Sequence, residues 1–220
     1  MGCPESRTID GFEKHLAVNH LAHFTLTVML LPTLIASSQP EFNSRVIFVS
    51  SSSHRYSSIH FDNYNLKGHY EWPVAYGQSK TANNWTSHYV DRVYGSRGVH
   101  SLCLMPGSIW TGLTKYAAPK DIERWKKEPD TVKAMETTEQ GAASTVWAAV
   151  SPVWEGEGGK YLSACSIAPL DTGGQFTSAS DGHGPDCYNR EGEDRLWELS
   201  AELTGVDIEE RDGQFVTVFK

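Results

Sequence analysis

The sequence has little of what several classes of protein require. Its 19 lysines and arginines are outnumbered by 27 aspartates and glutamates, a net charge of -8, so the clustered positive charge that binds nucleic-acid phosphates is missing. Its four cysteines, at positions 3, 103, 165 and 187, form no CxxC pair of the kind that holds zinc or performs thiol redox chemistry. We therefore expect no nucleic-acid partner, no bound metal and four reduced thiols.

The sequence also lacks a long uninterrupted hydrophobic run. The strongest one, residues 26–36, covers about half of the ~20 residues that a membrane-spanning helix needs, and Thr27 and Pro32 interrupt it. No positively charged segment precedes it, as one does in a secretion signal. These absences predict a cytoplasmic protein without a membrane span.

What is present is an alternation of helical and strand patterns. Apolar residues at helical spacing predict four helices, over residues 10–37, 75–96, 138–150 and 193–203. Nearly continuous apolar runs, rich in β-branched residues, predict three strands buried on both faces, over 45–51, 99–106 and 159–164. The polar stretches between them predict loops over 54–74 and 171–192.

This order of elements defines the fold class. Strands that alternate with helices imply right-handed crossovers and a parallel sheet with helices on its faces, so the class is α/β. A chain of 220 residues can bury one substantial core, and we expect a single domain, 1–220. Asp10 is the predicted N-cap of the first helix, and Gly98 is the predicted end of the second.

Tyr76 and Lys80 form the first candidate for chemistry. Four positions apart on a helix, their side chains point the same way. A phenol has a pKa of about 10, and a neighbouring ammonium lowers it by favouring the phenolate, so the pair could transfer protons near neutral pH. Tyr116 and Lys120 have the same spacing, but Pro119 between them disfavours a regular helix.

Three further features lead to the same edge of the predicted sheet. Ser51 follows the first strand and Pro106-Gly107 ends the second, both at the carboxyl ends where open α/β sheets bind ligands. Asn19 is an amide in the middle of an apolar helix, where its propensity is poor, and it is therefore a candidate for a specific hydrogen bond.

In this order, the segments that begin at Asn19 (NHLAHFTLTVMLLPTL), Val46 (VIFVSSSSH), Tyr76 (YGQSKTAN) and Pro106 (PGSIWTG) resemble the consecutive motifs of the short-chain dehydrogenase/reductase (SDR) family. The chain is most similar to the branch of retinol-dehydrogenase-like and WW-domain-oxidoreductase-like members, which includes many fungal proteins. The similarity runs from Thr8 to Leu162. This resemblance implies the C-terminal part of a Rossmann-like, doubly wound parallel sheet.

The resemblance also implies a catalytic tetrad of Ser51, Tyr76, Lys80 and Asn19. Tyr76 would exchange a proton with the substrate oxygen, and Ser51, or Ser52 in its place, would hydrogen-bond that oxygen. Lys80 would lower the pKa of Tyr76 and hold the nicotinamide ribose, while Asn19 would anchor a water in the proton relay.

The cofactor implied by the resemblance is NADP or NAD. Ile109 and Thr111 would contact the nicotinamide carboxamide, and Tyr76 and Lys80 complete the predicted cofactor-binding set. Residues 110–133 would form a substrate lid, in which Trp110, Tyr116 and Trp125 are candidates to line an apolar pocket.

The part of the family pattern that binds the pyrophosphate is missing. The TGxxxGxG turn and the NNAG motif would align before Met1, and neither Gly173-Gly174 nor Gly182-His183-Gly184 lies in a strand-to-helix turn that could replace them. We expect an N-terminally truncated member, lacking the first strands, whose strand 45–51 has an uncovered edge. Natural truncation and an incomplete gene model both remain open.

The predicted function is oxidoreduction of a hydroxyl or carbonyl on a lipophilic small molecule with NAD(P), of the kind found in secondary metabolism. One alternative is a cofactor-free isomerase, dehydratase or cyclase that uses Tyr76 and Lys80. Another is a non-catalytic member that binds another subunit. Helices 10–36 and 76–96 match the helices that form dimer interfaces in the family, so we expect a homo-oligomer.

Overall fold

The structure, a computed structural model, describes residues 1–171 and 182–219. Its main sheet has the strand order β1-β2-β3-β4. Strands β1 (Ser44–Val49), β2 (Val99–Leu104) and β3 (Lys160–Ser163) are parallel, and the short β4 (Ser166–Ile167) runs antiparallel at the edge. The predicted α/β class, with a parallel sheet, is confirmed.

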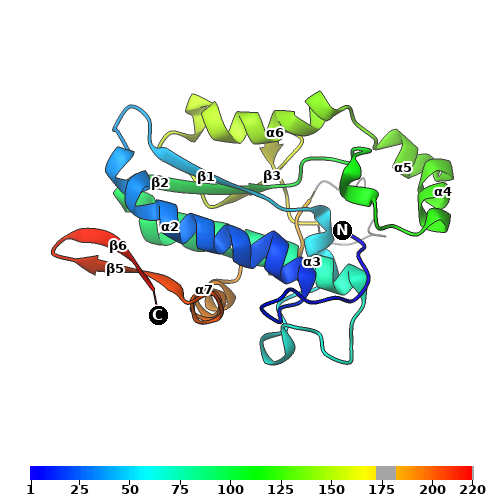
Figure 1. The fold of residues 1–220 in the computed structure, drawn as a ribbon. Coiled ribbons are helices and arrows are strands. Elements are labelled where there is room, and N and C mark those ends of the chain that lie inside the picture. The colour runs from blue at the N-terminus through cyan, green and yellow to red at the C-terminus, as the bar shows by residue number, and fades with distance from the viewer. Residues whose placement is uncertain (172–181, 220) are drawn as a thin grey trace.

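Helices cover both faces of this sheet (Figure 1). Helices α2 (Ala22–Ser37) and α3 (Trp72–Tyr94) lie on one face, and α6 (Thr138–Val150) lies on the other. Strand β2 is buried on both sides because its side chains alternate between two cores. Leu102 and Leu104 pack with Ala148 of α6, whereas Cys103 packs with Phe48 of β1 in a separate cluster.

The N-terminal helix differs from its prediction in where and how it begins. Asp10 is not its N-cap; the cap is Glu13, whose carboxylate accepts hydrogen bonds from the backbone N–H groups of His15 and Leu16. The helix starts with α1 (Lys14–Leu16) and continues through the π-helical turn η1 (Ala17–Leu21) into α2. Asp10 lies instead in an exposed turn before Gly11, whose φ of +85° bends the chain away from helical geometry.

Segment boundaries elsewhere agree with the sequence patterns, with local shifts. Helix α3 begins three residues earlier than predicted, and the loop before it contains the short 3-10 helices η2 (Ser52–Tyr56) and η3 (Phe61–Asn63). After η4 (Gly95–Arg97), Gly98 has a φ of +77° and ends the helical segment, as predicted. Helix α6 has the predicted bounds, with Thr137 and Gln140 forming a capping box.

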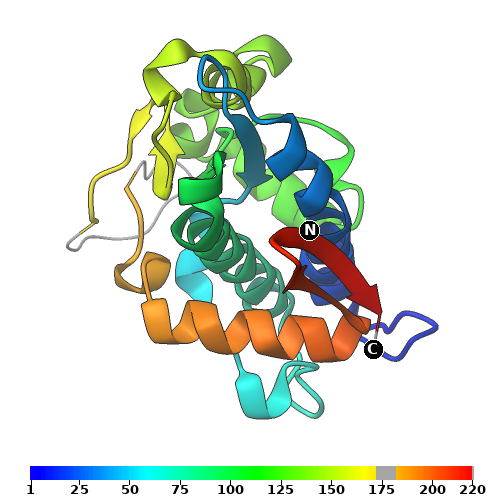
Figure 2. The ribbon, with the colours of Figure 1, turned by 90° about the vertical axis from the view of Figure 1, so that its left-hand side faces the viewer.

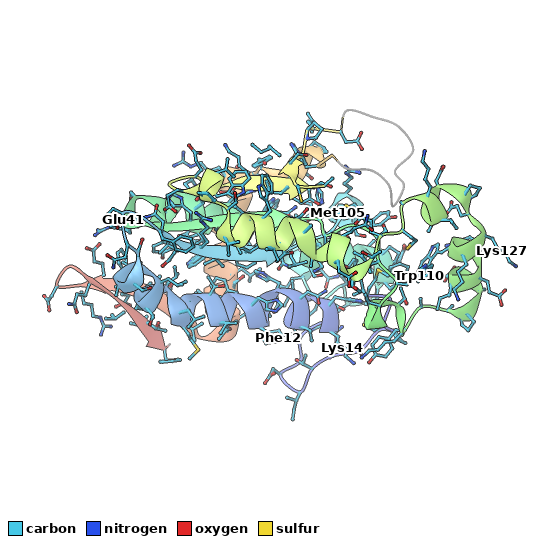
Figure 3. All side chains as sticks on the ribbon, turned by 90° about the horizontal axis from the view of Figure 1, so that it is seen from above. Phe12, Lys14, Glu41, Met105, Trp110 and Lys127 are labelled. Atoms are coloured by element: carbon cyan, nitrogen blue, oxygen red, sulfur yellow. The ribbon has the colours of Figure 1, made fainter. Side chains whose placement is uncertain are left out.

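The predicted irregular lid is more regular than expected. It contains η5 (Gly112–Thr114), α4 (Pro119–Lys127) and α5 (Pro129–Lys133). Pro119 and Pro129 occupy the first positions of α4 and α5. A backbone N–H at that position has no partner within the helix, so proline costs no hydrogen bond there and begins the helix instead of breaking it. Figure 3 shows Trp110 and Lys127 at the end of the molecule where the parallel strands terminate.

The C-terminal region adds a layer that the sequence only partly indicated. Helix α7 (Arg190–Thr204) begins three residues before its predicted start and follows η7 (Pro185–Cys187). A hairpin of β5 (Val206–Arg211) and β6 (Gln214–Phe219) was not predicted. Figure 2 shows α7 crossing the outer side of α3, with the hairpin beside α2. Residues 172–181 of the predicted loop, with Gly173-Gly174, lie outside the described residues.

Two surfaces are not covered by other elements of the described chain, the outer side of β1 and one side of the N-terminal helix. No described strand pairs with the outer side of β1. The continuous helix Lys14–Ser37 is apolar and long enough to cross a membrane by length and composition, with a mean hydropathy of 1.4, although a third of that stretch is buried in the fold. Its exposed side carries four apolar residues, Val18, Leu26, Met29 and Leu30.

Candidate active site

The site lies where β1 and β2 end and α3 begins. The backbone N–H of Ser50 donates to the Leu104 carbonyl at 2.7 Å, and its hydroxyl donates to the Lys80 carbonyl at 3.0 Å. These bonds tie the end of β1 to β2 and to the third turn of α3. The topology therefore brings the predicted site residues to one edge of the sheet.

Ser51 and Tyr76 are brought together as predicted. Ser51 is the N-cap of η2, where its hydroxyl accepts from the Ser53 N–H, and it lies close enough to Tyr76 to affect the pKa of the phenol. Tyr76 is 4% exposed, and this burial raises the pKa of its phenol to about 12, with the nearby Ser51 side chain acting in the opposite direction. Ser52 is buried beside it in the chain, so the serine that pairs with Tyr76 here is Ser51.

Lys80 lies near Tyr76 and is held by a backbone carbonyl. Its ammonium nitrogen is 5.6 Å from the centre of the Tyr76 ring and donates to the Val49 carbonyl at 2.9 Å. Burial lowers the pKa of Lys80 to about 8. The pKa of Tyr76 is therefore raised, and not lowered as expected. Desolvation of the phenol outweighs the effect on its pKa of an ammonium that is held at a backbone carbonyl.

The first turns of α3 are fixed by tight packing. Gly77 faces η2 so closely that a Cβ atom there would lie 2.8 Å from the Ser53 carbonyl oxygen. Gln78 is fully buried, where it accepts from the His60 N–H and donates to the Tyr64 carbonyl, both at 2.9 Å. The small and amide side chains of the YGQSK segment thus hold Tyr76 against the loop that presents Ser51.

Asn19 is linked to the same turn of α3. Its side-chain amide donates to the Ser79 hydroxyl at 3.0 Å, and that hydroxyl donates to the Tyr76 carbonyl at 2.7 Å. Asn19 lies in the π-helical turn η1, whose extra residue widens the helix, and such turns are frequent at functional sites. The sequence could identify the amide but not the π-helical turn that presents it.

The Pro106-Gly107 turn leads to the two residues predicted to contact nicotinamide. Ile109 is half-buried and packs on Gly141 of α6, where a Cβ would collide with it. Thr111 is exposed, and its hydroxyl accepts from the Leu113 N–H at 3.2 Å as the N-cap of η5. Both residues lie beyond the carboxyl end of β2, on the chain that enters the lid.

A cavity of about 180 Å³ lies between the N-terminal segment, the start of α3 and the lid. Four aromatic residues lie in its wall, Tyr70, Trp72, Tyr116 and Trp125, together with the N-terminal segment Met1–Pro4. Trp72 is one helical turn before Tyr76, so the cavity lies at the start of the helix that carries Tyr76 and Lys80, although neither residue is in its wall. Trp110, the third aromatic expected there, is not in the wall; the Lys126 ammonium lies 5.8 Å from its ring centre instead.

Sequence reasoning missed a buried group on the other side of Tyr76. The His15 ring lies edge-on, with its centre 5.9 Å from the centre of the Tyr76 ring, and contacts Cys3 and Glu13. No spacing rule pairs a cysteine with a histidine twelve residues later, because the contact depends on how the N-terminal turn folds back on α1. A second cavity, of about 370 Å³, lies between α7 and β5, away from these side chains.

Comparison with known proteins finds extensive similarity. No family model matches the chain. A Penicillium roqueforti protein named short-chain dehydrogenase/reductase prx1 is 45% identical over 207 residues, which are 94% of this chain and 60% of that protein. Mouse retinol dehydrogenase 11 is 33% identical over 210 residues, or 95% of this chain and 60% of that protein.

Among solved structures, an uncharacterized protein from Mycobacterium paratuberculosis matches with a TM-score of 0.61 and 26% identity, over 93% of this chain and 63% of that one. The chain thus spans about three fifths of the length of the relatives it matches. With its four motifs in order and this similarity along nearly all of its length, the chain belongs to the short-chain dehydrogenase/reductase family.

Proposed function

We propose that the chain provides the proton-transfer site of an oxidoreductase that interconverts a hydroxyl and a carbonyl on a lipophilic small molecule. The observation that carries the proposal is that Ser51 lies close enough to the Tyr76 phenol to oppose the rise of its pKa, with Lys80 one turn further along α3. The aromatic cavity beside Trp72 supports a lipophilic substrate, and the name of the mouse relative, a retinol dehydrogenase, agrees with that class.

Tyr76 is the proton donor in the direction of carbonyl reduction. With its pKa raised to about 12, the phenol is protonated at neutral pH, so it can donate its proton to the oxygen of a bound carbonyl compound. Ser51 would hydrogen-bond the same oxygen and hold it against the phenol. The reverse reaction needs the phenolate, and a substrate that excludes water from the site and draws the Lys80 ammonium toward the hydroxyl would favour it.

A nicotinamide cofactor fits one part of the site. Lys80 has three N–H donors, of which one is directed at the Val49 carbonyl, and it lies at the carboxyl ends of the strands, where ribose hydroxyls could accept from the others. Ile109 and Thr111 would hold the carboxamide end. The nicotinamide, when bound, supplies or accepts the hydride. The described residues offer no glycine-rich loop for the pyrophosphate, so the fit is limited to the nicotinamide riboside end.

Binding of two nucleotides tests this assignment. We expect the 220-residue chain to bind reduced nicotinamide mononucleotide and NADPH with similar, weak affinity, because both present the same riboside to Lys80. Nucleotide fluorescence would report binding, and Lys80→Ala should weaken both equally, with Lys133→Ala on the surface of the lid as the control. If neither nucleotide binds at millimolar concentration, the redox function is wrong for this chain.

We also propose that the chain associates with a second copy. The outer side of α3 is covered by α7, so the support comes from the exposed apolar side of the preceding helix, where Leu26 and Met29 are each about half exposed. Light scattering after size exclusion measures the mass directly. Leu26→Glu should shift a dimer to a monomer, and a monomeric wild-type chain would exclude the association.

A further inference from the structure

His54 is a buried histidine in the loop that presents Ser51, and the proton transfer proposed above does not use it. It lies in η2, three residues after Ser51, and it is 4% exposed. Burial lowers the pKa of its imidazole to about 4, so the ring is neutral at neutral pH. A neutral imidazole has one N–H donor and one acceptor nitrogen, and the groups around the ring determine which nitrogen has which role.

Two backbone groups define the tautomer of His54. The Gly184 N–H lies 2.9 Å from Nε2, and because an amide N–H can only donate, Nε2 must be the acceptor. The ring proton is therefore on Nδ1, which lies 2.7 Å from the Ser51 carbonyl oxygen and donates to it. The two bonds lie on different sides of the ring and together fix its orientation.

The Ser51 carbonyl thus has two donors from the same residue. The backbone N–H of His54 donates to it at 3.1 Å, which is the usual bond of a 3-10 turn, and Nδ1 adds the second donor. The Ser51 hydroxyl accepts from the Ser53 N–H at 3.1 Å and keeps its own proton for a further acceptor. The direction of that hydroxyl therefore depends on the peptide that His54 holds.

The other side of the imidazole is attached to a part of the chain far from Ser51 in sequence. Gly184 is buried and comes after β4. The His183 N–H donates to the Pro169 carbonyl at 2.8 Å, and the His183 carbonyl accepts from the Asp171 N–H at 2.9 Å. The Arg55 guanidinium, next to His54, lies 3.3 Å from the Asp171 carboxylate. These bonds give the imidazole a fixed anchor in the C-terminal segment.

We propose that His54 is a positioning residue of the oxidoreductase site, which holds the Ser51 hydroxyl toward the substrate oxygen from its anchor at Gly184. This role rests on the proposed function, because it acts through Ser51 and includes no proton transfer by the imidazole itself. Without the Nδ1 donor, the Ser51 peptide can rotate and its hydroxyl leaves the substrate oxygen. The chemical step then slows, while binding of the substrate is little affected.

Two amide variants separate the two bonds of His54. The amide nitrogen of asparagine reaches the position of Nδ1, so His54→Asn keeps a donor for Ser51 and loses the acceptor for Gly184. The longer His54→Gln reaches the position of Nε2 and keeps only the bond to Gly184. With retinal and NADPH, we expect His54→Gln to lower kcat at least tenfold with KM changed less than twofold, and His54→Asn to retain at least five times the kcat of His54→Gln. Equal kcat values of the two variants would overturn the proposal.

A double-mutant cycle tests whether the effect passes through Ser51. Ser51→Ala should lower kcat by itself, and adding His54→Gln should then lower it less than twofold further, because no hydroxyl is left to position. A further tenfold loss would show that His54 supports the fold and not Ser51. His69→Gln, at an exposed histidine of the same loop, is the matched control and should keep kcat within twofold.

The tautomer of His54 gives a readout that does not depend on activity. Nitrogen NMR of ring-labelled histidine should show a protonated Nδ1 and an unprotonated Nε2, in signals that are assigned by their loss in His54→Asn. A protonated Nε2 in the neutral ring would overturn the proposal whatever the activity. A wild-type chain that has the expected tautomer but does not reduce retinal would instead refute the proposed function and support the bond to Ser51.

Discussion

Gly77 lies against Ser53 with no room for a side chain, since a Cβ atom on it would approach the Ser53 carbonyl oxygen to 2.8 Å. This contact joins the second turn of α3 to the loop that carries Ser51. The position of the Ser51 hydroxyl relative to Tyr76 therefore depends on a glycine that itself has no functional group.

Gly77→Ala is expected to destabilise the chain by about 1–3 kcal/mol, because the added methyl group must push η2 away. It should also lower activity, since Ser51 moves with η2. Chemical denaturation measures the first effect. Gly112→Ala is the control, because its Cβ would meet nothing within 4 Å, and equal stability of the two variants would show that the contact is not tight.

Tyr76→Phe is expected to lower carbonyl reduction by a factor of about 10²–10⁴, the usual contribution of a positioned proton donor, with little loss of stability. Tyr89→Phe on the same helix is the matched control, because its ring stacks on Trp197 with its centre 4.2 Å from the indole centre and lies outside the site. Retinal and NADPH serve as the assay pair. Equal losses in both variants would contradict the role given to Tyr76.

Stability is expected to fall as the pH drops below 6.5. Burial lowers the pKa of His54 to about 4 and those of His20 and His88 to about 3, whereas all three titrate near 6.5 when unfolded. Between these values the unfolded chain binds protons that the folded chain does not, at about 1.36 kcal/mol per pH unit for each histidine. Urea unfolding between pH 7 and pH 5 measures the slope.

The pH slope also has a residue-specific control. His54→Gln should make the slope shallower, whereas His69→Gln should leave it unchanged, since His69 is exposed and His54 is 4% exposed. Parallel curves for the wild-type chain and His54→Gln would mean that this histidine is not the source.

Glu155→Gln is expected to cost about 3 kcal/mol, because it leaves a buried cation without its carboxylate. The Arg45 side chain is 2% exposed, and its guanidinium lies 2.9 Å from Glu155 while donating to carbonyls at the end of α6. Glu157→Gln, two residues away and exposed, should cost less than about 0.5 kcal/mol. Thermal unfolding of the two variants gives the comparison, and the assignment requires that they differ.

Regular elements were predictable where one local pattern determined them. Helix α6 has a capping box and bounds that sequence patterns define, and β2 is buried on both faces, so its apolar run is nearly continuous. The start of the first helix was not predictable in this way, because Asp10 and Glu13 are both acceptable caps and only the fold of residues 1–12 selects Glu13.

The candidate site, too, was predictable only in part from the sequence. Spacing and order brought Ser51, Tyr76, Lys80 and Asn19 to one edge of the sheet, and the structure places them there. The raised pKa of Tyr76 could not be read from the sequence, because it follows from burial, which depends on packing by η2 and by the N-terminal segment.

The π-helical turn η1 determines the direction in which the side chains before it point, relative to those of α2. One residue more than an α-helical turn turns the N-terminal side chains by about 100° relative to α2. Removing one residue from Ala17–Leu21 would restore a regular helix and rotate His15 away from Tyr76. Insertions and deletions in this turn would then act as a coarse adjustment of which N-terminal side chains meet the active site, without any change in the residues themselves.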